Sequence, residues 1–369
     1  MTWAFGATGL KADNDRTQRR EKRMHMSDAL ISPAVGGTMW AVSGGIITYC
    51  ARKVKDSLRD NLVPLMGVLG AFIFTAQMIN FSIPGTGSSG HLGGGLILAV
   101  LLGPYAAFLV IASVLTVQAF FFADGGLLAL GCNIFNLGFY PAFIAYPFLY
   151  RVIAKDRYVS SRAVVAAIAA AMAGLQLGAF SVVLETKASG MSDLPFGTFV
   201  LLMQPIHLAI GLVEGLTTAA VVSFVARARP EVLPTAVATP AAPVRLKPLL
   251  AGLSLAALTI GGGVSWCAST RPDGLEWSIA KVTGKKEVAK PRGGLHARLA
   301  TVQEATAVLP DYGFKPPETA AAKPDKPETS GPWPAVSAGT SVSGIAGGLA
   351  TLLLVCLIGF VLKKRHATA

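Results

Sequence analysis

The stretch LILAVLLGPYAAFLVIASVLTVQAFFF, residues 96–122, is free of charged side chains and is interrupted by Gly103-Pro104. Residues 96–102 are too few to cross a membrane at 1.5 Å of helix rise per residue. We therefore expect a short helix that enters the membrane and a second helix, residues 105–122, that returns. Irregular backbone is tolerated at membrane depth only where protein or a cavity surrounds it. The break thus predicts a functional site nearby.

The composition of the whole chain supports a polytopic membrane protein of the all-α class. The mean hydropathy is +0.55, with 52% hydrophobic and 14% charged residues, which is far from the average of soluble globular proteins. The formal net charge of +12 does not indicate nucleic-acid binding, because the basic residues cluster between apolar segments. Such clusters orient membrane proteins.

Apolar segments recur along the chain, and each is expected to form a helix that enters or crosses the membrane. They predict a bundle of about seven helices followed by a two-helix module. Basic clusters that follow alternate segments mark cytoplasmic ends, so the N-terminus is expected outside and the C-terminus in the cytoplasm of a plasma-membrane protein. The segments are residues 29–50, 61–80, 96–102, 105–122, 130–150, 163–184, 198–225, 248–265 and 345–362.

These features divide the chain into four parts. A basic N-terminal extension, residues 1–23, would place many positive charges outside, which the charge rule disfavours. It does not resemble a signal peptide, so the start is misassigned, or the extension is removed or tolerated. Residues 24–225 form the helical bundle, residues 226–248 a Pro/Ala-rich cytoplasmic linker, and residues 249–369 the second module with an external polar loop, 269–338.

The dipeptide Met24-His25 suggests a metal site. If the chain begins at Met24, the α-amine, the amide nitrogen before His25 and a ring nitrogen of His25 can chelate one ion in two fused rings. A planar nitrogen set favours nickel(II) or copper(II). His91, in the loop FSIPGTGSSGHLGG, is the candidate for the fourth corner. A chance Met-His pair and a solvated loop histidine are the alternative interpretation.

Other polar side chains in the apolar segments are interpreted as contacts between helices, although ionisable groups at membrane depth are functional candidates. These are Gln77, Gln118, Gln204, His207 and Glu214. The four cysteines, at positions 50, 132, 267 and 356, lack any CxxC spacing and are interpreted as packing residues. Residues 275–282 are compatible with a short strand or turn.

Four motifs resemble a known family. MHMSDALISP from Met24, SSGHLGGGL around His91, QAFFFADGGLLALGCNIFNLGFYP at 118–141 and HLAIGLVEGLTT at 207–218 look like the CbiM/NikM family, the cobalt/nickel substrate-binding subunits of energy-coupling factor (ECF) transporters. The resemblance covers about residues 24–225. RPDGLEWSIAKVTG at 271–284 is similar to the NikN-type subunit or the PDGLE domain, so the chain resembles a fusion of the two.

The resemblance implies a metal-capture subunit, with Met24, His25 and His91 as the ligands and nickel or cobalt as cargo, not as a cofactor. The SGHLGG context resembles nickel-type members, and cobalt uptake for cobalamin synthesis is the alternative. The chain contains no phosphate-binding loop, so a transmembrane coupling subunit and cytoplasmic ATPases are the expected partners, beside membrane lipid. The second module is expected to stabilise or gate the site. An intramembrane metalloenzyme is disfavoured because there is no HExxH motif.

Overall fold

The computed structural model describes residues 24–56, 61–155, 157–233, 246–284, 288, 293–315 and 333–367. Within these ranges the chain is almost entirely helical, which confirms the all-α membrane-bundle class. The β-structure described there is one short antiparallel pair, β1 (Phe81–Ser82) and β2 (Ser89–Gly90), with Phe81 opposite Gly90. The N-terminal extension and most of the predicted linker lie outside the described residues.

The first module consists of the helical segments that the sequence predicts. The elements α5, η2 and α6 follow one another without a break as one long helix. Its middle part, η2, is a π-helix that contains Pro141 and Pro147, and prolines lack the N–H of a regular α-helical ladder. The elements are η1 (Asp28–Leu30), α1 (Pro33–Asp56), α2 (Leu62–Gln77), α3 (Gly95–Leu102), α4 (Pro104–Phe121), α5 (Leu130–Ile134), η2 (Phe135–Tyr150), α6 (Arg151–Ala154), α7 (Ser161–Ser189), α8 (Phe196–Ala228) and η3 (Pro230–Val232).

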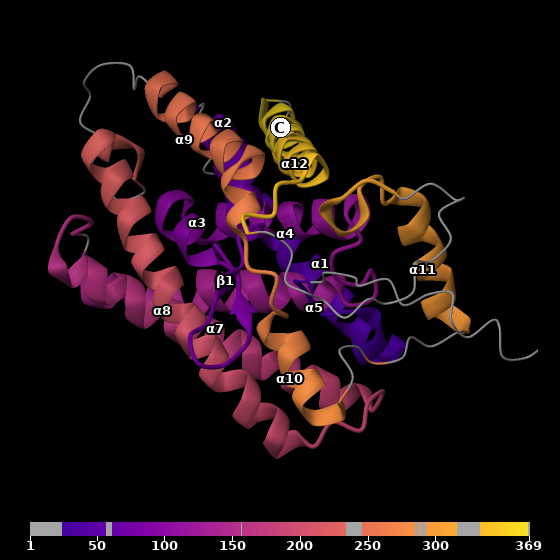
Figure 1. Ribbon diagram of the computed structural model, residues 1–369. Coiled ribbons are helices and arrows are strands. Elements are labelled where there is room, and N and C mark those ends of the chain that lie inside the picture. Colours follow the sequence, from indigo (N-terminus) through magenta and orange to yellow (C-terminus); the bar gives the residue numbers. More distant parts are fainter. Residues whose placement is uncertain are drawn as a thin grey trace, which may run out of the picture.

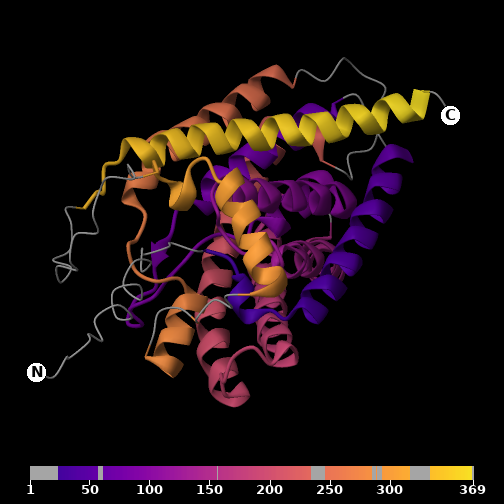
Figure 2. The same cartoon turned by 90° about the vertical axis from the view of Figure 1, so that its right-hand side faces the viewer.

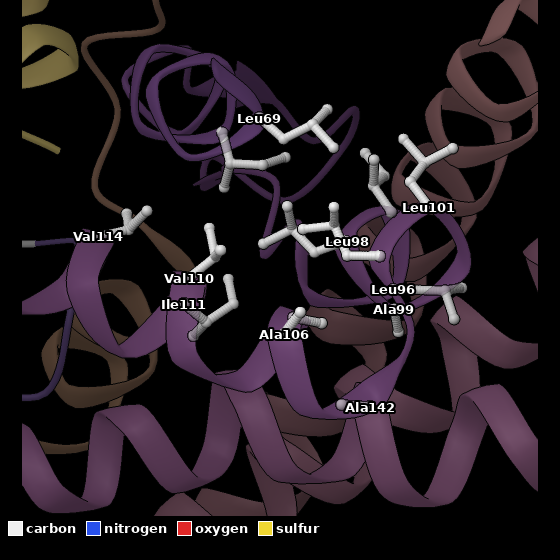
Figure 3. Packing of buried hydrophobic residues seen from close by; sticks show 14 of the residues in the cluster. Leu69, Leu96, Leu98, Ala99, Leu101, Ala106, Val110, Ile111, Val114 and Ala142 are labelled. Atoms are coloured by element: carbon white, nitrogen blue, oxygen red, sulfur yellow. The ribbon is translucent and has the colours of Figure 1, made fainter. Parts of the chain in front are cut away.

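The short helix before Gly103 is confirmed. Gly103 separates α3 from α4 with φ 81° and ψ 164°, a conformation that is open essentially only to glycine. Pro104 then starts α4, where its missing N–H costs nothing. Every residue of α3 is buried, and its side chains interlock with those of α2 and α4 (Figure 3). The broken segment is thus surrounded by protein, as membrane depth requires.

The second module packs its two long helices against the first module. Helices α9 and α12 lie beside α2 (Figure 1), and α12 runs as one long helix across the top of the molecule in Figure 2. The shorter helices α10 and α11 lie between α9 and α12 in the sequence. They contact α8 and α4 of the first module, respectively. The elements are α9 (Lys247–Gly262), η4 (Val264–Cys267), α10 (Gly274–Thr283), α11 (Gly294–Thr306), η5 (Pro310–Tyr312) and α12 (Ala338–Ala367).

The strand or turn expected at residues 275–282 is wrong, because this stretch is the helix α10. The Asp273 carboxylate caps its N-terminus by accepting a hydrogen bond from the Glu276 N–H at 2.7 Å. Gly284, at φ 69°, ends it in the left-handed conformation typical of a helix C-terminus. Of the predicted external loop, residues 316–332 lie outside the described part of the chain.

Among the residues that the structure describes, five helices are long and apolar enough to cross a membrane. Large apolar side chains point outward from two of them, with Leu201 74% and Phe148 67% exposed, as expected of a surface that faces lipid. Helices α2 and α9 are apolar but shorter. The five spans are Pro104–Phe121, Leu130–Ala154, Ser161–Ser189, Phe196–Ala228 and Ala338–Lys363. The chain is therefore a multi-pass membrane protein.

The two helices of the second module touch through their backbones, and this contact is testable. A Cβ atom on Gly344 would lie 2.5 Å from the Gly261 carbonyl oxygen, so Gly344→Val is expected to push α12 away from α9. Overpacking of this kind typically costs about 1–3 kcal/mol of stability, seen as a lower midpoint of thermal unfolding in detergent. Gly252→Val, where nothing lies within 4 Å, is the control. Equal losses from both changes would contradict the contact.

Candidate metal site

The N-terminal strap, residues 24–31, lies against the loop between α4 and α5. The Met24 N–H donates to Asp124 Oδ1 at 2.8 Å, and the Met26 N–H donates to Asn133 Oδ1 at 3.2 Å. The Asn133 side-chain amide returns a hydrogen bond to the Met26 carbonyl at 3.1 Å, and the Gly126 N–H donates to the same carbonyl at 3.0 Å. These bonds fix the main chain on both sides of His25.

Two glycines in this loop allow the strap to approach so closely. Gly125 has φ 78°, and a Cβ there would lie 3.0 Å from the Cβ of His25. A Cβ on Gly126 would overlap the carboxyl group and main-chain nitrogen of Asp28. Because no other residue type leaves this space, the ADGG sequence is a structural requirement of the strap.

The structure brings together the three residues that the sequence proposes as ligands. The ring centroids of His25 and His91 are 5.2 Å apart, with the ring planes at 85°. His91 Nε2 lies 3.1 Å from the Met24 carbonyl oxygen and Nδ1 lies 3.1 Å from that of Leu92. Burial, followed by the neighbouring His25, lowers the pKa of His91. A neutral imidazole carries the lone pair that a metal ion needs.

A chain of hydrogen bonds links His25 to the loop that carries His91. The Gly93 carbonyl can only accept, so the Gln77 amide group donates to it at 2.8 Å. Gln77 Oε1 then accepts from Gln118 at 2.9 Å, which leaves Gln118 Oε1 as the acceptor for His25 Nε2 at 2.9 Å. His25 therefore donates from Nε2 to Gln118, so that Nδ1 is the ring nitrogen not used in this chain. The interpretation of Gln77 and Gln118 as mere helix contacts missed this role.

Asp124 is a site residue that sequence reasoning missed. Its side chain is buried, at 1% exposure, and its two oxygens have different partners. Oδ1 accepts from the Met24 N–H at 2.8 Å, and Oδ2 accepts from the Tyr312 hydroxyl at 2.6 Å. The available signal was its position in the loop of the motif at 118–141, next to two glycines.

Of His207, Glu214 and Gln204, which the sequence interprets as contacts between helices, only Gln204 makes a hydrogen bond to a neighbouring helix within the described ranges. Glu214 accepts hydrogen bonds from the Gly93 and Gly94 N–H groups at 2.7 and 3.1 Å. His207 Nδ1 lies 2.8 Å from the Met203 carbonyl one turn earlier in α8. Gln204 bonds to the main chain of α7. Glu214 thus holds the turn that follows His91.

A cavity of about 90 Å³ opens between the strap, the His91 loop, α7 and α8, and it is also lined by residues 273–275 of the second module. Over the described ranges, no group of three His, Cys, Asp or Glu side chains is placed to hold a metal ion. Among the residues that line the cavity are His25 and His91, together with neighbouring residues of the strap and of the His91 loop.

The second module contacts the site at several points. The Ser89 N–H and hydroxyl, two residues before His91, donate to the carbonyls of Pro272 and Arg271 at 2.7 and 2.8 Å. His296, in α11, is buried and donates from Nε2 to the Ile31 carbonyl at 2.9 Å. Both the His91 loop and the strap are thus bonded to the segment between α9 and α12.

Two family models match the chain. The model described as "Cobalt uptake substrate-specific transmembrane region" matches residues 25–232, and the model of the PDGLE domain matches residues 247–364. The chain is 37% identical to a putative fused nickel transport protein NikMN of Archaeoglobus fulgidus, over 57% of this chain and 68% of that protein. It is 32% identical to the fused nickel transport protein NikMN of Rhodobacter capsulatus, over 78% and 88%. It is also 37% identical to a putative metal transport protein of Haloquadratum walsbyi, over 57% and 93%.

The role of Glu214 can be tested by Glu214→Gln. In glutamine one of the two carboxylate oxygens is replaced by an NH₂ group, which cannot accept a hydrogen bond. One of the two hydrogen bonds from the Gly93 and Gly94 N–H groups is therefore lost. The expected loss is about 1–3 kcal/mol of stability, measured by thermal unfolding in detergent. Glu231→Gln, which changes an exposed carboxylate in η3, is the control. If the two variants unfold alike, Glu214 does not support the loop.

Proposed function

The chain belongs to the CbiM family, the cobalt uptake substrate-specific transmembrane proteins, and from this premise we propose that it captures nickel(II) or cobalt(II) at the membrane surface for import. It is a transport component, not an enzyme, and the metal is cargo. The observation that carries the proposal is the meeting of Met24, His25 and His91 around one cavity. Nickel is the preferred ion, and cobalt is the alternative.

The proposed ligands are the Met24 nitrogen, the His25 main-chain nitrogen, His25 Nδ1 and one ring nitrogen of His91. The hydrogen bond from His25 Nε2 to Gln118 leaves Nδ1 free, and Nδ1 is the ring nitrogen that closes a six-membered chelate ring with the amide nitrogen of its own residue. The Met24 and His25 nitrogens close the second ring. Planar nitrogen coordination of this kind suits nickel(II), which is why we propose nickel over cobalt.

This chelate requires a free amine at Met24 and therefore a working chain that begins there. The amide nitrogen before His25 must also lose its proton when the metal binds, as ligands generally do. Protonation or displacement of one nitrogen weakens the whole planar set, which supplies a route for release. Residues 24–225 form the capture domain in this proposal, residues 226–248 the linker and residues 249–369 the second module.

The charges favour an orientation with the strap outside. Helix α1 begins beside the strap and ends with Lys53 and Lys55 in its last turn. The continuous helix from α5 to α6 likewise begins beside the strap and reaches Arg151 at its far end. Basic residues mark the cytoplasmic side, so we propose that the strap faces outward and that the C-terminus is cytoplasmic.

Transport energy has to come from other subunits, because the sequence contains no phosphate-binding loop. We propose the partners of an ECF transporter, namely a transmembrane coupling subunit and cytoplasmic ATPases. The second module stabilises the capture site in this arrangement. This part of the proposal is supported by hydrogen bonds that join the segment between α9 and α12 to the first module. Arg271 accepts from Ser89, and His296 donates to the Ile31 carbonyl.

The first test is the intact mass of the protein purified from its native membrane. We expect a mass that corresponds to a start at Met24, because only that start leaves the amine free for chelation. A mass that retains residues 1–23 would exclude the amine-based chelate, and the two histidines would then need other ligands.

The histidine variants test the ligand set separately. His25→Ala removes a ring nitrogen from the chelate and is expected to abolish nickel accumulation by cells that express the partner subunits. His91→Ala leaves three nitrogens and is expected to lower nickel affinity by about 100-fold, since even the loss of an outer-shell partner typically costs 10–100-fold. The control is Thr259→Ala, which removes a hydroxyl that bonds within its own helix α9, away from the cavity. Parent-like accumulation by both ligand variants would disprove the assignment.

A further inference from the structure

We propose that Tyr312, in the second module, is a positioning residue for the Met24 nitrogen and acts through Asp124; this inference rests on the proposed function. The Tyr312 hydroxyl donates to Asp124 Oδ2 at 2.6 Å, and the opposite oxygen of the same carboxylate accepts from the Met24 nitrogen at 2.8 Å. Asp124 therefore bridges a side chain of the second module and a proposed metal ligand of the first.

The tyrosine is held firmly where its hydroxyl meets Asp124. Its ring stacks on Phe122, with centroids 4.9 Å apart and planes at 15°. The main chain around it is bonded to the end of α4, since the Leu309 and Asp311 N–H groups donate to the carbonyls of Phe121 and Phe122 at 3.1 and 2.9 Å. Because of these contacts, the hydroxyl oxygen stays beside the carboxylate as long as the ring remains stacked on Phe122.

The backbone of this turn is unusual. Asp311 and Tyr312 have φ of 55° and 58°, in the left-handed region that residues other than glycine seldom occupy. Such conformations persist where the surrounding structure enforces them and are concentrated at functional sites. Here the result of the conformation is that the Tyr312 side chain turns into the first module and reaches Asp124.

Asp124 is suited to accept a hydrogen bond from an amine that binds a metal ion. A metal-bound amine keeps N–H groups, and a carboxylate that accepts from one of them directs the nitrogen lone pair toward the ion and increases its basicity. Burial, followed by the charge of Asp124, raises the pKa of Tyr312 well above its usual range. The phenol thus keeps its proton and remains a donor, so that Asp124 is free to accept from Met24.

A second side chain of the second module, Gln303, also holds the chain around Asp124 in place. The Gln303 amide group, in α11, donates to the carbonyls of Ala119 and Gly125 at 3.0 and 2.7 Å. These carbonyls lie before and after Asp124 in the chain. The second module therefore holds both the main chain around Asp124 and one oxygen of its carboxylate, although it supplies no ligand itself in the proposed chelate.

The test is Tyr312→Phe in the full chain, purified from the membrane in detergent with its native N-terminus. Phenylalanine keeps the stacking on Phe122 and removes only the hydroxyl. We expect nickel affinity, measured by competition with a chromophoric chelator, to fall about tenfold. We also expect the visible absorption of the bound nickel, and the electron paramagnetic resonance spectrum of copper(II) bound in its place, to change. The metal-free protein is expected to unfold at a somewhat lower temperature, because Oδ2 of the buried carboxylate loses its partner, so the spectra are the readout that distinguishes positioning from support. Tyr140→Phe, in η2 and outside this network, is the matched control.

A double-mutant cycle with Asp124→Asn separates positioning from general support. If Tyr312 acts through Asp124, Tyr312→Phe has little further effect on affinity or spectrum in the Asp124→Asn background. The same loss in both backgrounds would overturn the inference, as would a single variant with the affinity and spectrum of the parent. Absence of nickel binding by a parent with a free Met24 amine is a different result, because it refutes the proposed function itself.

Discussion

The hydrogen bond between the Met24 nitrogen and Asp124 is the contact on which the site depends, because the strap, the α4–α5 loop and the second module all meet there. It is the bond that holds the Met24 nitrogen itself, and a chelate built on main-chain nitrogens needs that nitrogen in a fixed position. The buried carboxylate would be costly if it were unpaired. Its partners on both sides make it a joint between the two modules.

The helical bundle around Asp124 holds the His91 loop in a fixed position. The loop that carries His91 is anchored after this residue, where Glu214 accepts from the Gly93 and Gly94 N–H groups just before the buried helix α3. It is anchored before this residue where Ser89 donates to the carbonyls of Pro272 and Arg271. His91 projects from between these anchors. A loop histidine would otherwise be mobile, and the anchoring explains how the residue comes to lie beside the strap.

The sequence predicted the features that are encoded locally. The break at Gly103-Pro104 predicted a short helix, and the apolar segments predicted the order of the helices. Residues 275–282 were misjudged, although Asp273 and Gly284 are ordinary capping signals for the helix α10 that forms there. Tyr312 and Asp124 lie 188 residues apart in the chain, and no local pattern connects them. Such a contact depends on how two modules dock, which sequence periodicity does not encode.

The hydrogen-bond chain from His25 through Gln118 and Gln77 ends at the Gly93 carbonyl. Each link is an amide group, whose nitrogen has no basic lone pair with which to accept a further proton, and the final acceptor is a carbonyl oxygen with no proton to pass on. The chain can orient an imidazole at the edge of a membrane without conducting protons inward.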